Sequence, residues 1–356
     1  MIITEIDNIK IASIAAAVSN DWTSLLDSSD EDPSIIKKFI KKTGVEGRYN
    51  AGIKQTTSDF CYAAAKKIIE EKNIDRSKIG ILVFVTQTPD YGIPATACVL
   101  QDRLGLPKDC IAFDVNLGCS GFTYGLNIVS SLMKSSNVDM ALLLCGDTSA
   151  KERRASVKVK TSHSANMLFG DSGTATLLVK DENCQPIKII SRTDGSGYKA
   201  IISPHAGFRN PSASFDDEFT TMDDVAVFNF TISEVPELLK ETMTLQNCTP
   251  NDYDCLVLHQ ANLFIMKNVA KRTGFDMGKT LVSLDKFGNT SSSSVPITLV
   301  KNYGDTVEDK ELHTLMCGFG VGLSWSTVDC FVNEKDILPL VHTDEYFEDG
   351  YPSCCE

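Results

Sequence analysis

The sequence has no excess of basic residues. Its 356 residues include 34 Lys and Arg against 47 Asp and Glu, which gives a formal net charge of −13 at pH 7. Proteins that bind the phosphates of nucleic acids usually present a basic face, so this balance argues against nonspecific nucleic-acid binding. Two lysine-rich stretches, 37–42 and 267–272, are the exceptions, and charge runs of this kind are more often solvated surfaces than binding sites.

The sequence also lacks long apolar runs. No stretch approaches the roughly 18 consecutive apolar residues needed to span a bilayer, although 42% of all residues are hydrophobic. The first ten residues, MIITEIDNIK, contain early acidic residues and lack the basic segment and apolar core of a secretory signal. We therefore expect a cytoplasmic protein that does not contact a membrane.

Closely spaced cysteine pairs of the kind that bind metals are missing as well. Twelve cysteines are present, but none forms a CxxC pair, and structural zinc sites depend on such spacing. Several of the cysteines lie in apolar segments: Cys61, Cys98, Cys145, Cys255 and Cys330. We expect most of the cysteines to be reduced core residues, and we expect no metal site.

Apolar patterns alternate between strands and helices along the chain. Segments 79–86 and 111–115 are short, apolar and β-branched, as buried strands are. Segment 57–73 carries apolar residues at helical spacing behind a Thr/Ser/Asp cap. This alternation predicts an α/β fold of βαβ units with mainly parallel sheets. The order restarts near residue 185, so we expect two similar halves, 1–182 and 183–356.

One cysteine differs in its setting from the others. In the stretch FDVNLGCSGF at 113–122, a predicted strand ends and Cys119 follows beside Gly118 and Gly121. These glycines permit a tight turn and predict room for a substrate beside the sulfur. A helical pattern begins directly behind Cys119, and a helix N-terminus stabilises a thiolate and lowers a thiol pKa. A cysteine that only fills the core is the commoner alternative, and this pattern alone leaves both open.

Two later stretches place polar residues in comparable positions. An apolar strand ends on His259 and a helix follows, and the carboxyl ends of strands face the crevice where α/β folds bind ligands. Further on, Gly288 and Asn289 form a turn before a Ser/Thr run, with Pro296 suited to the first turn of a new helix. A histidine satisfied within the core and a capped helix start are the structural alternatives.

In this order, DVNLGCSGFTYGL, LHQAN and FGNTSSSSVP resemble the three active-site motifs of the beta-ketoacyl-ACP synthase III family, condensing enzymes of the thiolase fold. The resemblance covers nearly the whole chain, including TGVEGRY, GIPATACVLQDRLGL, MLFGDSGTATLL and GFGVGLSW. It implies two similar βαβαβ halves packed as a five-layered αβαβα structure. It also implies decarboxylative condensation of acyl-CoA with malonyl-ACP to a 3-oxoacyl thioester, in fatty-acid initiation or a specialised pathway, without metal or cofactor.

The resemblance implies a role for each aligned residue. Cys119 is the nucleophile that becomes acylated, and the backbone amides of Cys119 and Val321 hold the oxyanion. His259, through Nε2–H, and Asn289, through its side-chain amide, donate hydrogen bonds to the malonyl-derived enolate. Ile93 aligns with a bulky residue that the partner subunit inserts near the acyl pocket, which implies a homodimer.

Other aligned positions depart from the family pattern. Lys38 aligns with a tryptophan that stacks on the CoA adenine, and Lys42 aligns with a nearby arginine. Phe264 aligns with an arginine that docks acyl carrier protein, and Asn262 of the LHQAN motif is a further candidate for substrate contact. We therefore expect altered CoA binding and a bias towards a specialised pathway, with acyl carrier protein as the probable partner.

Related activities make different demands on the same positions. A thiolase has a second catalytic cysteine, but Gly318 rather than Cys317 occupies the aligned position, and adjacent strand residues face opposite sides. A hydroxymethylglutaryl-CoA synthase needs a glutamate where Gln87 stands. An acyltransferase that passes the acyl group to a hydroxyl or amine tends to carry an acid in place of Asn289. Retention of all three motif residues disfavours a non-catalytic partner subunit.

Overall fold

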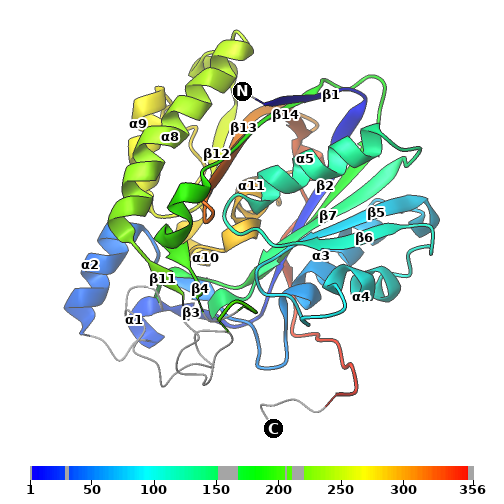
Figure 1. The fold of residues 1–356 in the computed structure, drawn as a ribbon, viewed down its shortest axis with the longest axis horizontal. Coiled ribbons are helices and arrows are strands. Elements are labelled where there is room, and N and C mark those ends of the chain that lie inside the picture. The colour runs from blue at the N-terminus through cyan, green and yellow to red at the C-terminus, as the bar shows by residue number, and fades with distance from the viewer. Residues whose placement is uncertain (1, 29–31, 151–166, 205–206, 211–219, 352–356) are drawn as a thin grey trace.

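Two sheets organise the chain. The computed structural model describes residues 2–28, 32–150, 167–204, 207–210 and 220–351 (Figure 1). In spatial order, the six-stranded sheet contains β15 (Val341–His342), β2 (Ile9–Val18), β8 (Ser172–Lys180), β7 (Met140–Asp147), β5 (Ile79–Val85) and β6 (Ile111–Val115). The five-stranded sheet contains β1 (Ile3–Ile6), β9 (Ile187–Thr193), β14 (Ser324–Asn333), β13 (Glu311–Gly320) and β12 (Cys255–Leu258).

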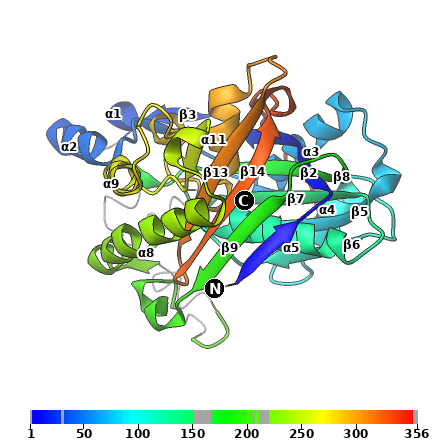
Figure 2. The same cartoon turned by 90° about the horizontal axis from the view of Figure 1, so that it is seen from above.

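Helices form three layers around these sheets. The outer layer on the six-stranded sheet consists of α3 (Thr57–Glu71) and α4 (Thr96–Arg103). The middle layer, which contacts both sheets, consists of α5 (Gly121–Lys134) and α11 (Ser294–Tyr303). The outer layer on the five-stranded sheet consists of α8 (Asp224–Leu245) and α9 (Leu263–Thr273), as Figure 2 shows from above. This is the five-layered αβαβα structure that the sequence predicts.

Smaller elements complete the fold. They are β3 (Trp22–Ser24), α1 (Leu25–Ser28), α2 (Pro33–Thr43), β4 (Gly47–Tyr49), β10 (Ile201–Ile202), β11 (Thr221–Met222) and α10 (Leu284–Phe287). Among the described helices, none combines the length and apolar character that crossing a bilayer requires.

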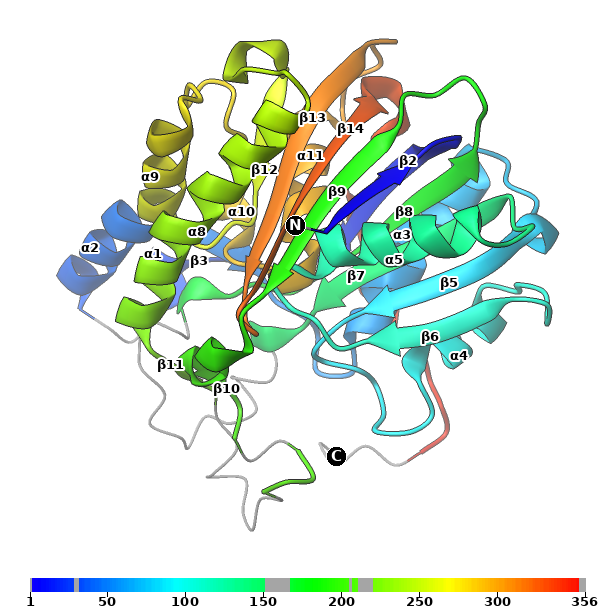
Figure 3. The same ribbon diagram turned by 45° about the horizontal axis from the view of Figure 1, so that its top comes forward.

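The middle layer joins the two sheets into one core. In α5, Phe122, Leu126, Val129 and Met133 recur at helical spacing and are buried in a cluster that contains strands of both sheets. Figure 3 shows α5 in the wedge between the sheets. Fully burying each such side chain contributes about 1.5–3 kcal/mol relative to leaving it exposed. The start of α5 is therefore held rigidly between the two halves of the chain.

The sheets are mixed, and the prediction of mainly parallel sheets is wrong for the five-stranded one. There, β12 and β13 pair in parallel, while the pairings of β13 with β14, β14 with β9 and β9 with β1 are antiparallel. Residues 321–323 alone connect β13 to β14, and a connection so short can only form a hairpin. The prediction of parallel pairing relied on strands alternating with helices. That alternation does not extend to residues 311–333, where β14 follows β13 without a helix between them.

The two terminal strands cross between the halves. β1 pairs with β9 in the five-stranded sheet, although it belongs to the segment 1–182. β15 pairs with β2 in the six-stranded sheet, although it belongs to the segment 183–356. Each segment therefore supplies a strand to the other segment's sheet, and the boundary between two similar halves stays a prediction.

Most of the predicted core cysteines are buried. Cys61, Cys145, Cys255 and Cys330 are buried and free. Cys98 is also free, but it is exposed on α4 and is an exception to the prediction that most cysteines lie in the core. The apolar neighbours of Cys98 in the sequence face the other side of this short helix.

Candidate active site

Cys119 lies between the end of β6 and the start of α5. The helix begins at Gly121 with Ser120 as its N-cap, so the thiol stands at a helix N-terminus, as predicted. The backbone amides of Val321 and of Cys119 itself act to lower the pKa of the thiol. These are the two amides expected to hold the oxyanion.

The turn after β13 comes directly against this thiol. A Cβ atom placed on Gly320 would lie 2.6 Å from Cβ of Cys119 and 2.9 Å from its Sγ. No side chain fits in that space, so the close approach requires glycine. This contact brings the amide of the next residue, Val321, onto the sulfur.

The space beside Gly118 and Gly121 is occupied by side chains of the protein and is not open to a substrate. A Cβ atom on Gly118 would lie 2.2 Å from Oε1 of Gln87, and one on Gly121 would lie 2.6 Å from Cγ1 of Val85. The expectation of open space at these two positions was therefore wrong. It failed because Val85 at the end of β5 and Gln87, two residues further on, fill the two gaps.

The thiol is not a ready-made thiolate. Burial raises the pKa of Cys119 to about 12, and the nearby Asp147 carboxyl also raises it. The Val321 and Cys119 amides and the Ser291 hydroxyl lower the pKa, but they do not outweigh burial. The predicted lowering by the helix N-terminus is thus corrected, because removing a charge from water costs more than the helix field returns. Acylation requires a group that accepts the thiol proton.

His259 follows the last residue of β12 and is 2% exposed. Its backbone N–H donates to the carbonyl of Cys317 at 2.7 Å, and its Nδ1 lies 2.7 Å from Oγ of Ser294. Burial lowers the pKa of His259 to about 3, so the ring is neutral at neutral pH. When the Ser294 hydroxyl donates to Nδ1, the one ring proton resides on Nε2.

Asn289 is held in place by its backbone and by its own side chain. Its N–H donates to the carbonyl of Leu168 at 2.8 Å, and its carbonyl accepts from the N–H of Gly170 at 3.1 Å. Its Oδ1 accepts from the N–H of Ser291 at 2.9 Å. This last bond uses the acceptor end of the carboxamide and leaves the Nδ2 amino group to donate.

The run of serines 291–294 links His259 to Asn289. The Ser294 hydroxyl lies 2.7 Å from Nδ1 of His259, and Ser291 donates its N–H to Oδ1 of Asn289 at 2.9 Å. The φ of Ser291, 52°, lies in the left-handed region, which non-glycine residues rarely adopt. A Cβ atom on Gly121, two residues after Cys119, would lie 3.1 Å from Cβ of Ser292, so this serine run brings Cys119, His259 and Asn289 to one site.

Three residues of this site were missed from the sequence. Ser291 and Ser294 belong to a run of four serines, and all four are buried. Asp147 ends the apolar strand β7, at the same edge of the sheet at which β6 leads to Cys119. Consecutive hydroxyls before an apolar helix, and an acid that ends an apolar strand, were the signals available in the sequence.

The predicted substrate residues lie outside this cluster. Lys38 and Lys42 are exposed on α2, which packs against α9. Phe264 is 51% exposed and stacks on Phe228, with ring centroids 5.8 Å apart. Asn262 is the N-cap of α9, where its Oδ1 accepts from the N–H of Ile265 at 2.8 Å. That bond gives Asn262 a structural role, and contact of these residues with substrate stays a prediction.

The second cysteine required by a thiolase is absent from this site. Cys317 is fully buried in the core cluster formed by the five-stranded sheet with α8 and α9. A Cβ atom on the next residue, Gly318, would instead meet Ser120 and Thr123 beside Cys119. The alternation of strand residues, which argued against a thiolase, is confirmed.

Comparison with known sequences agrees with this geometry. Residues 113–195 match the family described as 3-oxoacyl-[acyl-carrier-protein] synthase III, and residues 243–329 match its C-terminal part. The chain is 32% identical to β-ketoacyl-[acyl-carrier-protein] synthase III of Shigella dysenteriae over 308 residues, 86% of this chain and 92% of the relative. It is 32% identical to the synthase III of Clostridium perfringens over 292 residues, 80% and 87% of the two chains.

Solved structures show the same architecture. The 3-oxoacyl-(acyl-carrier protein) synthase of Burkholderia xenovorans aligns with a TM-score of 0.89 at 32% identity, over 96% of this chain and 99% of that one. A priming β-ketosynthase from the R1128 polyketide pathway shares the fold at 22% identity, with a TM-score of 0.79 over 94% and 97% of the two chains. The predicted thiolase-like fold is confirmed.

Proposed function

The chain belongs to the β-ketoacyl-[acyl-carrier-protein] synthase III family, and we propose that it condenses an acyl thioester with a malonyl thioester. The observation that carries this proposal is the serine run 291–294, which contacts His259 through Ser294 and Asn289 through Ser291 and packs beside the turn of Cys119. A nucleophilic sulfur and two neutral hydrogen-bond donors then face one reaction centre. The product is a 3-oxoacyl thioester.

In the first step, the sulfur of Cys119 attacks the carbonyl carbon of acyl-CoA. The thiol gives up its proton, the bond from the acyl carbon to the CoA sulfur breaks, and CoA leaves as its thiol. The amides of Cys119 and Val321 donate to the carbonyl oxygen while it carries negative charge. Both amides favour the charged sulfur, which suits donors to negative charge that develops beside it.

In the second step, a malonyl thioester binds and loses CO2. The electrons of the broken bond form an enolate, whose oxygen accepts hydrogen bonds from Nε2–H of His259 and the amino group of Asn289. The enolate carbon attacks the acyl carbon on Cys119, a carbon–carbon bond forms, and the sulfur is released. A neutral histidine suits this step because it stabilises the enolate without protonating it. The proposed steps use no metal or dissociable cofactor.

Release of CO2 distinguishes condensation from simple acyl transfer. With an acyl-CoA and a malonyl thioester labelled in its free carboxyl group, we expect one labelled CO2 for each 3-oxoacyl thioester formed. The assay should compare malonyl-CoA with malonyl carrier protein to identify the carrier. Transfer of the acyl group to a hydroxyl or amine without labelled CO2 would replace this proposal by the acyltransferase alternative.

Two exposed positions that differ from the family pattern, Phe264 and Lys38, align with residues that bind the carrier protein and CoA. We propose that an acidic acyl carrier protein docks on α9, which carries Lys267, Lys271 and Arg272. Phe264 on the same helix cannot form the ion pair of the aligned arginine. Lys38 on α2 likewise lacks the flat ring that stacks on adenine, so the contacts with CoA should differ from the family pattern.

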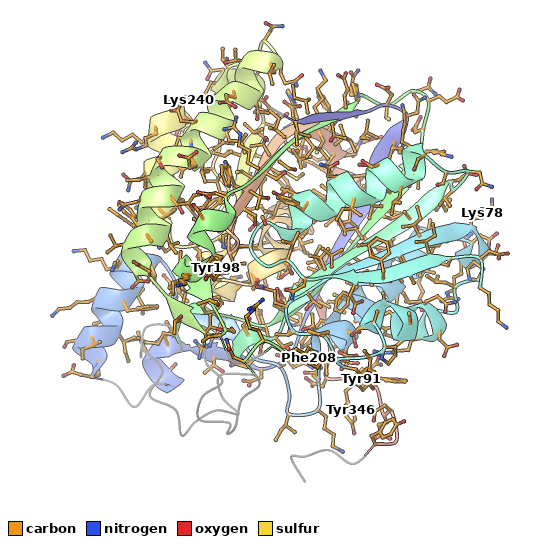
Figure 4. All side chains as sticks on the ribbon, viewed as in Figure 1. Lys78, Tyr91, Tyr198, Phe208, Lys240 and Tyr346 are labelled. Carbon is orange, nitrogen blue, oxygen red and sulfur yellow. The ribbon has the colours of Figure 1, made fainter. Side chains whose placement is uncertain are left out.

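We also propose a homodimer in which each chain completes its partner's acyl pocket. Ile93 is 90% exposed in the loop before α4, and the hydroxyl of Tyr91 in this loop donates to Asp349 at 2.5 Å. Figure 4 shows Tyr91 beside Tyr346 of the C-terminal segment. The neighbouring strand β6 ends the six-stranded sheet and exposes 47% of Ile111, and such an edge can pair with a second copy.

Light scattering tests this arrangement and should give twice the mass of one chain. Ile93→Ala should keep the reaction but shift which acyl-CoA chain lengths acylate Cys119, because a smaller side chain enlarges the pocket. A monomer with normal turnover, or an unchanged chain-length preference in Ile93→Ala, would contradict the proposal.

A further inference from the structure

The site contains a buried carboxyl group that the proposed steps do not use. Asp147 is 1% exposed at the end of β7. One of its oxygens, Oδ1, accepts from the N–H of Gln87 at 2.7 Å and from the hydroxyls of Thr86 and Thr88 at 3.2 Å and 3.4 Å. The other, Oδ2, accepts from the hydroxyl and the N–H of Ser292 at 2.9 Å and 3.2 Å. A single side chain thus ties the segment that follows β5 to the serine run.

The turn that carries Cys119 is packed between the two segments that this carboxyl group ties together. A Cβ atom on Gly118 would lie 2.2 Å from Oε1 of Gln87, in the segment that follows β5. A Cβ atom on Gly121 would lie 3.1 Å from Cβ of Ser292, in the serine run. Close-packed groups leave little room to shift, so the relative position of the two segments decides where the sulfur stands relative to the serine run.

The serine run leads from one proposed enolate donor to the partner of the other. Ser291 donates its N–H to Oδ1 of Asn289 at 2.9 Å. The hydroxyl of Ser294 lies 2.7 Å from Nδ1 of His259. Ser292 lies between these two serines, so its bonds to the buried carboxyl group hold the run at both ends. A shift of the run would move both donors relative to the sulfur.

We infer that Asp147 is a positioning residue for condensation, which holds the serine run so that His259 and Asn289 stand at the right distance from the acylated Cys119. The inference rests on the proposed condensation. Asp147 gains and loses no proton in this role, so the two steps stand as written. Groups that orient reactants are sensitive to small shifts, and a misplacement of about 1 Å can lower a rate about 100-fold.

The hydrogen bonds require a group that accepts from both segments at once. The two oxygens of a carboxylate do this, whereas the amide of an asparagine accepts with its oxygen and donates with its NH2 group. In Asp147→Asn, the oxygen should face the N–H of Gln87, which makes the shortest of these bonds. The NH2 group would then face the N–H of Ser292, and two donors cannot bond to each other. The serine run should therefore shift while the segment that follows β5 stays in place.

The test compares the two half-reactions in Asp147→Asn. Intact-protein mass spectrometry after rapid quenching gives the rate at which acyl-CoA labels Cys119, and labelled CO2 gives the rate of condensation by the acylated enzyme. Condensation should fall about 10- to 100-fold, while acylation should be kept because it uses neither donor held by the serine run. The loss should lie in kcat for the malonyl thioester, with KM little changed, since the displaced groups act on the transition state.

Ser292→Ala tests the same tie with a smaller change. Alanine keeps the Cβ atom beside Gly121 and the N–H that donates to Asp147, and it leaves the charge of the carboxylate in place. Condensation should fall relative to acylation by roughly two- to tenfold, the range expected for loss of one hydrogen bond. If Asp147→Asn does not fold, as its melting temperature would show, this variant decides alone.

Two matched controls separate positioning from the general loss of a buried polar group. Asp329→Asn changes a carboxyl group on β14 that is 5% exposed and accepts from the hydroxyl of Tyr253 at 2.5 Å. Ser130→Ala removes the hydroxyl of a fully buried serine on α5, which donates to the carbonyl of Leu126 at 2.6 Å. Both controls should keep the wild-type ratio of condensation to acylation.

A wild-type ratio in Ser292→Ala would overturn the inference, whether both rates are kept or both fall equally. An unchanged rate of condensation in folded Asp147→Asn would overturn it as well, and so would a loss that appears only as a higher KM for the malonyl thioester. Failure of the wild-type protein to release labelled CO2 would instead refute the proposed function, so the two failures are distinguishable.

Discussion

Cys119→Ala should abolish acyl-enzyme formation and lower condensation by on the order of 10³-fold or more, because no other group can carry the acyl chain between the two steps. Intact-protein mass spectrometry after incubation with acyl-CoA should show the adduct in the wild type and none in the variant. The enolate clamp of His259 and Asn289 does not use the sulfur, so slow release of CO2 from the malonyl thioester should persist.

The matched control for this variant is Cys98→Ala. Cys98 is free and exposed on α4, so among the described cysteines it is the thiol most open to nonspecific acylation. Its replacement should leave the adduct and the turnover unchanged. An adduct of undiminished size in Cys119→Ala would show that the nucleophile is another residue and would refute the proposed mechanism.

Asn289→Asp should keep the first half-reaction, acylation of Cys119, and impair the second, condensation with the malonyl thioester. The carboxylate can still accept the hydrogen bond from the N–H of Ser291, so the loop and the acylation of Cys119 should be kept. It cannot donate to the enolate and it repels the negative charge, so condensation should fall on the order of 10²–10³-fold. Parallel measurements of the Cys119 adduct and of labelled CO2 give the two rates.

The pH dependence of Asn289→Asp provides a second check. A protonated carboxyl group donates as an amide does, so condensation by the variant should recover in part as the pH falls. Ser294→Ala should cause a smaller loss in the same step, because it removes the partner of Nδ1 that keeps the His259 proton on Nε2. Equal losses of acylation and condensation in Asn289→Asp would instead indicate that the site had collapsed.

Local sequence patterns were sufficient for many of the elements and for where Cys119 and His259 stand in them, whereas the catalytic roles came from the family resemblance. Apolar spacing predicted β5, β6 and α5, and with them the placement of Cys119 at a helix N-terminus. The end of β12 predicted His259 by the same reasoning. These predictions succeeded because strand alternation, helix periodicity and helix capping depend on neighbours within a few residues.

Predictions that depended on distant contacts were less complete. Periodicity says nothing about whether β13 and β14 pair as a hairpin, or that β1 crosses into the sheet of the other half. The glycines beside Cys119 predicted open space, but Gln87 and Val85 fill it. The helix start predicted a lowered thiol pKa, whereas enclosure and the Asp147 carboxyl raise it.

The amino-acid sequence by itself determined the order of strands and helices and which side chains stand at the strand ends facing the site. Only the tertiary structure decided that the serine run 291–294 lies against the residues of the site, and that burial and the Asp147 carboxyl raise the pKa of Cys119. The physical reason is that desolvation and charge coupling depend on groups brought together from distant parts of the chain, which local spacing does not encode.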